Sequence, residues 1–290
     1  MVEKDRNRYW RLEYMNTWFI TGSSSGIGAG IAQAALELGD NVVVMARKVE
    51  SLDQFVKKYP TRVLALPLEL TDRTSIYAAV EQANARFGGI DILVNNAGHG
   101  YRAAVEEGES KNVAEIFQTN FFGAVELIKL ILPQMREKHS GAIINISSIA
   151  AVSSGVGSGY YASTKAALEL LSDALYQEVS PLGIKVMVVE PGAFRTRFYD
   201  DSLKGTQIKI ADYAQTAGTR RKENIVNLHN QQGDPIKAGK VIVETIGKKD
   251  YPRTLLLGSD AVRFVRNQLQ MKLEEITQWN KVSNSTDFDS

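Results

Sequence analysis

The sequence has 290 residues, of which 44% are hydrophobic and 23% are charged. This length and hydrophobic content are enough for one large hydrophobic core or two modest ones. Its 34 basic and 33 acidic residues nearly cancel, which excludes the strongly basic surface typical of nucleic-acid-binding proteins. The chain has no cysteine, which excludes disulfides, a thiol nucleophile and thiolate metal sites.

Other features of the chain indicate where the protein is located and what it does not bind. His99, His139 and His229 are scattered and form no metal-ligand pattern, so we expect no metal. No apolar run approaches the length of a membrane span, and the charged stretch from Met1 to Met15 lacks the apolar centre of a secretory signal. We therefore expect a cytoplasmic protein with no nucleic-acid or membrane partner.

Apolar runs alternate with helical patterns along the chain. The predicted strands are 17–21, 42–46, 63–66, 91–95, 142–147, 184–190 and 253–257, and the predicted helices are 26–38, 73–87, 110–137 and 160–180. Several strand candidates are apolar at consecutive positions, as expected for strands that are covered on both faces. The pattern predicts an α/β fold, a Rossmann-like doubly wound parallel β-sheet flanked by helices in a single domain.

The first strand is followed by the segment TGSSSGIG, residues 21–28, which contains three glycines and three serines. An apolar stripe at helical spacing follows and stops at Gly39. A helix N-terminus offers unpaired N–H donors and a positive dipole end, so this turn suits a pyrophosphate. The alternative is a Gly/Ser turn with no ligand, since the spacing G-x-x-x-G-x-G differs from the common dinucleotide fingerprint G-x-G-x-x-G.

Three more polar clusters follow predicted strands. They are NNAG at residues 95–98, NISS at residues 145–148, and the pair Pro191 and Gly192. Ligands of open parallel sheets bind at the carboxyl ends of the strands, so all three clusters should share one rim with the glycine turn.

Tyr161 and Lys165 lie four residues apart on the predicted helix 160–180, so both side chains emerge on one face. A phenol titrates near 10, and lowering its pKa towards 7 takes about 4 kcal/mol of preference for the phenolate. An ammonium group nearby in a partly dry pocket supplies most of that preference. The alternative is that the two residues are neighbours on the protein surface.

In this order and spacing, the motifs resemble those of the short-chain dehydrogenase/reductase family, in its single-domain subgroup. The resemblance covers residues 16–262 and rests on Thr21-Gly22-x-x-x-Gly26-x-Gly28, Asn95-Asn96-Ala97-Gly98, Asn120, Ser148, Tyr161-x-x-x-Lys165 and Pro191-Gly192. It selects Ser148 over Ser147 and Tyr161 over Tyr160.

The resemblance implies a catalytic set. Tyr161 would be the general acid/base, and Lys165 would lower its pKa and hold the nicotinamide ribose. Ser148 would polarise the substrate oxygen, and Asn120 would hold a water that extends the proton relay from Lys165.

The resemblance also implies a cofactor site. Its residues would be Gly22, Ser24, Ser25, Gly26, Ile27 and Gly28 at the pyrophosphate, Glu69 and Leu70 near the adenine, Asn96, Ala97 and Gly98 after the fourth strand, and Tyr161, Lys165, Pro191, Gly192 and Thr196 near the nicotinamide. For Asn96 a structural role between strands is an equal alternative. At Glu69 the family more often has Asp.

Cofactor choice depends on the end of the second strand. Ala46 stands where family members that use NAD(H) usually carry Asp, and Arg47 follows it. An arginine there suits a 2′-phosphate, which favours NADP(H) over NAD(H). The alternative is that Arg47 and Lys48 are ordinary solvated charges.

These features lead to a functional expectation. We expect an NADP(H)-dependent oxidoreductase that interconverts a ketone or aldehyde and an alcohol by hydride transfer. One alternative is an NADP(H)-binding sensor or scaffold without turnover, which the intact Ser148, Tyr161 and Lys165 argue against. The other is an epimerase or dehydratase of the extended branch, whose chains usually carry a larger C-terminal domain and a differently spaced glycine turn.

The segment 193–218 is the expected substrate lid. Its apolar residues are Phe194, Phe198, Tyr199, Leu203, Ile208, Ile210 and Tyr213. They suggest a bulky apolar substrate, steroid-like or retinoid-like. The alternative is that these side chains only pack the lid itself.

We expect three sections of chain: an N-terminal extension at 1–15, the family domain at 16–280 and a polar tail at 281–290. Near the end, a helical stripe extends beyond the usual core: Val262, Val265, Leu269, Leu273 and Ile276. This stripe would cover the active site, cover a partner subunit or extend the core. Following the family, we expect a homodimer or homotetramer.

Overall fold

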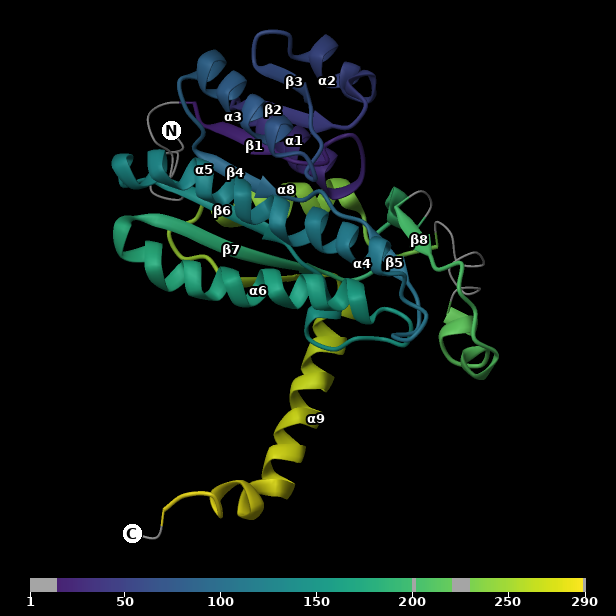
Figure 1. Ribbon diagram of the computed structural model, residues 1–290. Coiled ribbons are helices and arrows are strands. Elements are labelled where there is room, and N and C mark those ends of the chain that lie inside the picture. The colour runs from purple at the N-terminus through teal and green to yellow at the C-terminus, as the bar shows by residue number, and fades with distance from the viewer. Residues whose placement is uncertain (1–14, 200–201, 221–229, 289–290) are drawn as a thin grey trace.

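The computed structural model describes residues 15–199, 202–220 and 230–288. Its centre is a seven-stranded sheet in the order β3-β2-β1-β4-β6-β7-β9, in which every neighbouring pair is parallel (Figure 1). The strands are β1 (Thr17–Ile20), β2 (Asn41–Ala46), β3 (Val63–Pro67), β4 (Ile92–Asn95), β6 (Gly141–Ile146), β7 (Ile184–Pro191) and β9 (Thr254–Leu257). The predicted doubly wound parallel sheet is confirmed.

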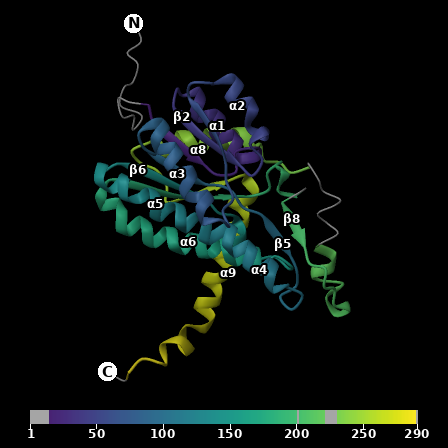
Figure 2. The ribbon, with the colours of Figure 1, turned by 45° about the horizontal axis from the view of Figure 1, so that its top comes forward.

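Helices cover both faces of this sheet (Figures 1 and 2). The helices of the described residues are α1 (Gly26–Glu37), α2 (Asp53–Lys58), α3 (Arg73–Phe87), α4 (Ser110–Phe117), α5 (Gly123–Lys138), α6 (Gly159–Val179), α8 (Pro235–Ile246) and α9 (Ser259–Asn284). One-turn helices lie at Val49–Leu52, Ile149–Ala151, Ser180–Leu182, Arg197–Tyr199 and Ala211–Tyr213.

Alternate residues of each strand face different cores. Ile20 of β1 packs with residues of α1 and α8, whereas Phe19 packs with residues of α3, α5 and α6. Both residues are fully buried. Because apolar side chains are needed on both faces, the strands read as continuous apolar runs in the sequence.

The structure differs from the predicted elements at several points. The helix expected at 110–137 is interrupted by a π-helical turn at Gln118–Phe122, between α4 and α5. Two short strands, β5 (Gly100–Arg102) and β8 (Leu203–Gly205), form a separate parallel pair that was not predicted. Helix α8, also not predicted, lies close to α1, where Gly30 and Gly239 leave no room for a Cβ on either helix.

Helix α9 begins on the body of the protein and then extends away from it (Figure 1). Of the predicted stripe, only Val265 is buried, whereas Leu269, Leu273 and Ile276 are exposed. Helix α9 continues past the expected boundary between 280 and 281 and ends at Asn284. The predicted N-terminal extension lies outside the described residues except for Met15.

The described residues include one helical stretch, Ser110–Lys138, that is long and apolar enough to cross a membrane by length and composition. This stretch differs from our expectation that no run approaches such a length. Its residues Leu127, Ile128, Ile131 and Met135 are buried in the core against α3 and β6, which is typical of a core helix.

Candidate functional site

The glycine turn joins β1 to α1 as predicted. Gly22 and Gly26 have φ angles of 68° and 60°, in the left-handed region that favours glycine. The turn is held against β4 by Thr21, whose Oγ1 accepts hydrogen bonds of 2.9 Å from the backbone N–H groups of Asn96 and Ala97. The backbone of the turn is therefore fixed by the neighbouring strand end.

The N-terminus of α1 faces the end of this turn. Ser25 precedes the helix with an extended backbone, and its side chain makes no capping hydrogen bond. The backbone N–H groups of the first helical turn have no partner within the helix, so they remain available to a bound anion.

Asn96 ties the strand end to the glycine turn. Its side-chain Nδ2 donates to the carbonyl oxygens of Thr21 and Gly22 at 2.9 and 3.0 Å. A Cβ on Gly28 would collide with this amide and with the Gly22 carbonyl oxygen. Of the two roles considered for Asn96, these contacts support the structural one, and they explain why residue 28 is a glycine.

A pocket of about 730 Å³ opens at the carboxyl ends of the strands. The predicted site residues that line it are Gly22, Ser24, Ser25, Gly26, Ile27, Arg47, Glu69, Leu70, Asn96, Ala97, Gly98, Ser148, Tyr161, Lys165, Pro191, Gly192 and Thr196. Gly28 and Asn120 lie outside this lining and contribute through their neighbours. The polar clusters at the strand ends thus share one rim.

Lys165 of α6 reaches the floor of the pocket with a side chain that is 5% exposed. Its Nζ donates a 2.7 Å hydrogen bond to the carbonyl oxygen of Ile146 and lies 5.9 Å from the centre of the Tyr161 ring. Burial lowers the pKa of Lys165 to about 8, and the nearby Glu169 opposes this shift.

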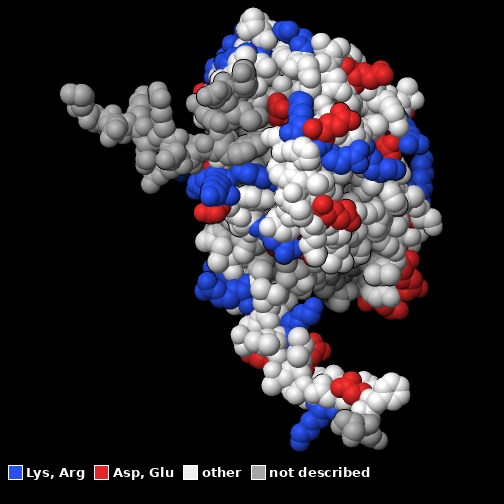
Figure 3. All heavy atoms as spheres, turned by 90° about the vertical axis from the view of Figure 1, so that its left-hand side faces the viewer, with Lys and Arg blue, Asp and Glu red and all other residues white. Residues whose placement is uncertain are grey.

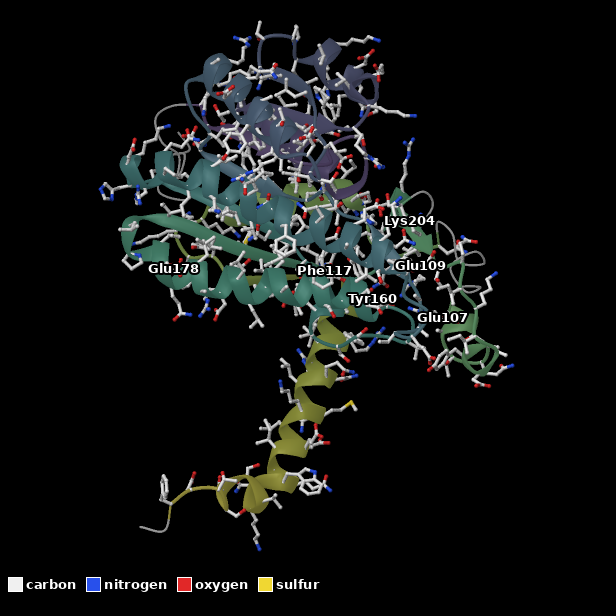
Figure 4. The ribbon with its side chains drawn as sticks, viewed as in Figure 1. Glu107, Glu109, Phe117, Tyr160, Glu178 and Lys204 are labelled. Atoms are coloured by element: carbon white, nitrogen blue, oxygen red, sulfur yellow. The ribbon has the colours of Figure 1, made fainter. Side chains whose placement is uncertain are left out.

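Tyr160 and Tyr161 point in different directions from α6. Tyr161 lines the pocket and packs against Phe198, with ring centroids 5.4 Å apart. The hydroxyl of Tyr160 instead donates a 2.6 Å hydrogen bond to the carbonyl oxygen of Val105, outside the pocket lining (Figure 4). Adjacent residues of a helix point about 100° apart, so the two tyrosines face different surroundings. Tyr161 is the one that lines the pocket.

Ser148 follows β6 and lines the same pocket as Tyr161. It precedes the short helix Ile149–Ala151, where its Oγ accepts a 3.2 Å hydrogen bond from the backbone N–H of Ala150. Because this bond uses an acceptor position, the hydroxyl proton stays available to a ligand.

Asn120 lies in the π-helical turn and is 2% exposed. Its Oδ1 accepts from the backbone N–H of His99 at 3.0 Å, and its Nδ2 donates to the His99 carbonyl and to Thr164 Oγ1. These bonds fix the segment after β4 against α6. Such π-turns often occur at functional sites.

Arg47 and Glu69 stand at the other end of the pocket from Tyr161. Arg47 follows β2 and is exposed at the pocket wall. Glu69 follows β3, and its Oε1 accepts hydrogen bonds from the backbone N–H and hydroxyl of Thr71 at 3.1 and 2.9 Å.

The segment after β4 anchors the predicted lid. Glu107 is fully buried, and its Oε1 and Oε2 accept from the backbone N–H groups of Ile210 and Ala104 at 2.9 and 3.0 Å. Glu109 accepts from the backbone N–H of Gln207 at 3.2 Å. Figure 4 shows both carboxylates near β5 and β8.

The lid is described at 193–199 and 202–218. Some of its apolar residues are placed to contact a substrate and others are not. Phe194, Phe198 and Leu203 line the pocket, whereas Ile208, Ile210 and Tyr213 do not. The Tyr213 hydroxyl instead donates to Glu106 at 2.7 Å. The side chain of Tyr199 lies outside the described residues.

Sequence reasoning missed several lining residues. Two of them, Asp260 and Phe264, come from the first turns of α9. Asp260 accepts a 2.8 Å hydrogen bond from the backbone N–H of Ala193, which places α9 against the start of the lid. No spacing signal in the sequence connects these segments.

Within the part of the chain that the structure describes, no group of three or more His, Asp or Glu side chains is arranged to hold a metal ion. On the face shown in Figure 3, basic and acidic side chains are interspersed.

The comparisons with known proteins agree on one class of protein, the oxidoreductases. The family model described as short chain dehydrogenase matches residues 16–206. An oxidoreductase of Botryotinia fuckeliana is 34% identical over 92% of this chain and 97% of its own length. A 3-ketodihydrosphingosine reductase of Bacteroides thetaiotaomicron is 37% identical over 80% of this chain and 84% of its own.

Solved structures agree with these relatives. The crystal structure of a short-chain dehydrogenase from Streptomyces avermitilis is 41% identical, with a TM-score of 0.88 over 96% of this chain and all of that one. Two structures share the fold at lower identity. An alcohol dehydrogenase from Thermococcus sibiricus with 5-hydroxy-NADP is 23% identical, with a TM-score of 0.69 over 84% of this chain and 96% of that one. A short chain dehydrogenase/reductase from Burkholderia phymatum with NAD is 19% identical, with a TM-score of 0.79 over 90% of this chain and 97% of that one.

Proposed function

The chain belongs to the short-chain dehydrogenase family, and from that premise we propose that this oxidoreductase interconverts a ketone or aldehyde and an alcohol with NADP(H). The observation that carries the proposal is that Ser148, Tyr161, Lys165 and the glycine turn all line one pocket.

The pocket fits a nicotinamide dinucleotide. The uncapped N-terminus of α1 and the left-handed glycines of its turn suit a pyrophosphate. Lining residues extend from Arg47 and Glu69 at one end to Tyr161 and Thr196 at the other, as two linked nucleosides require. When bound, the nicotinamide supplies or accepts the hydride.

We propose a preference for NADP(H) over NAD(H). Its support is Arg47, an exposed guanidinium at the adenosine end of the pocket, together with Ala46 before it, which offers no carboxylate to a ribose 2′-hydroxyl. A phosphate and a guanidinium form strong charge-assisted hydrogen bonds.

The proton transfer in this proposal belongs to Tyr161. During reduction its hydroxyl donates a proton to the carbonyl oxygen of the substrate, and during oxidation its phenolate accepts the alcohol proton. The Ser148 hydroxyl donates a hydrogen bond to the same oxygen. The Lys165 ammonium, next to the Tyr161 ring, favours the phenolate, and Asn120 holds the backbone beside it.

We propose a bulky apolar substrate, steroid-like or retinoid-like in size and polarity. Three apolar side chains of the pocket, Phe198, Leu203 and Phe264, lie on the lid and on α9 and support this class. The relative named as a 3-ketodihydrosphingosine reductase carries a name that refers to a keto compound.

The remaining expectations concern organisation and location. We propose a single family domain with a cytoplasmic location, and a homodimer or homotetramer. The exposed apolar side chains of Leu269, Leu273 and Ile276 on α9 support an assembly, because pairing would remove them from water.

A screen of ketones, aldehydes and alcohols with NADP(H) and NAD(H), followed by nicotinamide absorbance, tests the proposal. We expect turnover of bulky apolar compounds with NADP(H) and its loss in Tyr161→Phe. Tight NADPH binding without turnover of any compound would instead favour the sensor or scaffold.

A further inference from the structure

Acidic side chains from the loop 103–109 and from α4 accept hydrogen bonds from successive residues of the lid. In lid order the pairs are Lys204 with Glu115, Gln207 with Glu109, Ile210 with Glu107 and Tyr213 with Glu106. As the lid runs forwards along the chain, its acidic partners run backwards, so the two segments lie side by side in opposite directions. The lid is therefore attached along its length, at the edge where Figure 4 shows Lys204, Glu109 and Glu107.

Glu107 is fully buried and uses both of its carboxylate oxygens. Its Oε1 accepts from the backbone N–H of Ile210 at 2.9 Å, and its Oε2 accepts from that of Ala104 at 3.0 Å. Its backbone carbonyl oxygen accepts a 2.7 Å hydrogen bond from the hydroxyl of Thr206, a second lid residue. A side-chain amide has one acceptor oxygen and an NH₂ group that only donates, so glutamine cannot make both carboxylate bonds.

Glu109, in contrast, makes its bonds to the lid through one oxygen. Its Oε2 accepts from the backbone N–H of Gln207 at 3.2 Å and from the side-chain amide of Asn112 at 3.0 Å. The hydroxyl of Tyr101 donates to the same oxygen at 3.3 Å. The bond from Gln207 lowers the pKa of Glu109, so this acceptor is ionised at neutral pH. The single oxygen of a glutamine side chain can take its place.

The attached segment carries one wall of the pocket. Strand β8 pairs with β5 so that Leu203 lies opposite Gly100. A Cβ on Gly100 would collide with Leu203 Cδ1 and would lie 3.0 Å from Phe198 Cζ, so both side chains pack against this glycine. Phe198 also packs against the Tyr161 ring, with ring centroids 5.4 Å apart. The placement of the lid therefore determines what lies next to the proposed acid/base.

We propose that Glu107 and Glu109 are positioning residues for substrate selectivity. By attaching the lid, they keep Phe198 and Leu203 in place as the apolar wall that a bulky substrate contacts beside Tyr161. Neither glutamate lines the pocket, so both act through the lid alone. The effect on selectivity rests on the proposed function, whereas the attachment of the lid does not.

A large and a small ketone test this role, and the probes are a steroid ketone and cyclohexanone, each with NADPH. In Glu109→Ala the wall loses its support, so the KM for the steroid ketone should rise about tenfold or more. Cyclohexanone makes fewer contacts with the wall, so its kcat/KM should stay within about threefold of wild type. NADPH affinity should change equally little, because Glu109 does not line the pocket.

The glutamine variants distinguish hydrogen bonding from a merely structural role. Glu109→Gln keeps the acceptor oxygen, so its KM for the steroid ketone should stay within about threefold of wild type. Glu107→Gln leaves a buried backbone N–H without its acceptor, so the same KM should rise about tenfold or more. If Glu107→Gln does not fold, the comparison of alanine with glutamine at position 109 decides.

Glu178→Gln is the matched control, because Glu178 is an exposed glutamate of α6 that Figure 4 shows far from β8. It should follow wild type with both ketones. Equal losses for the steroid ketone and cyclohexanone in Glu109→Ala would overturn the selectivity role, and so would equal effects of alanine and glutamine at position 109.

Hydrogen exchange of the lid is a second readout, and it needs no turnover. Peptides covering 203–213 should exchange about tenfold faster in Glu109→Ala than in wild type, because the Gln207 N–H loses its acceptor, while peptides from α6 keep the wild-type rate. Unchanged exchange over 203–213 would overturn the attachment. If wild type reduces neither ketone, the proposed substrate class fails and the selectivity role fails with it, whereas the exchange rates still decide whether Glu109 holds the lid.

Discussion

The ammonium nitrogen of Lys165 lies 5.9 Å from the centre of the Tyr161 ring, one helical turn away on α6. The same nitrogen is held by the carbonyl oxygen of Ile146 at 2.7 Å, so its position beside the ring is fixed by the end of β6. A fixed cation in a buried site favours the phenolate more than a solvated one does.

The first prediction concerns Tyr161→Phe. This change keeps the ring that packs against Phe198 and removes only the hydroxyl oxygen. NADPH affinity should stay within a few-fold, whereas turnover should fall by about 10²–10⁴, as for the loss of a general acid or base. Steady-state kinetics and a fluorescence titration of NADPH measure the two effects.

Tyr160→Phe is the control for this experiment. It removes the hydrogen bond to Val105 outside the pocket, so turnover should remain near that of wild type. Full activity in Tyr161→Phe combined with loss in Tyr160→Phe would shift the site by one residue and contradict the assignment.

The second prediction concerns pH and cofactor binding. With its pKa lowered to about 8 by burial, Lys165 loses its ammonium proton as pH rises through that value. If the ammonium holds the ribose, NADPH affinity should fall between pH 7 and pH 9.5. Lys165→Met should bind more weakly at pH 7 and lack this fall. An identical pH dependence in both proteins would contradict the role.

The strands and the rim of the pocket were predictable because their signals are local. Runs such as Val186 to Val189 are apolar on both faces, and the polar clusters directly follow such runs. The carboxyl ends of parallel strands meet by geometry, which is why almost every predicted site residue lines the pocket.

Other parts depend on contacts between distant segments. The pair β5 and β8 is only three residues long on each side, and the segment that follows β8 is held by Glu107 and Glu109 from a loop. Asp260 reaches the lid from α9. A single side chain that satisfies a backbone group far along the chain leaves no periodic pattern in the sequence, so these features were missed.

The third prediction concerns Gly28. A Cβ at this position would collide with the Asn96 amide and with the Gly22 carbonyl oxygen, so Gly28→Ala must displace the bond between the turn and β4. We expect a lower melting temperature and at least tenfold weaker NADPH binding. Gly205→Ala is the control, since no atom lies within 4 Å of its Cβ position and it does not line the pocket. Unchanged binding in Gly28→Ala would mean that the turn tolerates the displacement.

The last prediction concerns Arg47, which is exposed at the end of the pocket remote from Tyr161. A charge-assisted bond between its guanidinium and a 2′-phosphate contributes about 1.5–3 kcal/mol and has no counterpart in NAD(H). Arg47→Ala should therefore weaken NADP(H) binding by roughly 10- to 100-fold while changing NAD(H) binding little. Lys48→Ala is the neighbouring control, because Lys48 is also exposed but does not line the pocket, and it should change neither affinity by more than a few-fold. Titration of both cofactors against the three proteins gives the ratio of affinities directly. Equal losses for NADP(H) and NAD(H) in Arg47→Ala would place the guanidinium away from the 2′-phosphate, since a contact with that group alone cannot weaken a cofactor that lacks it.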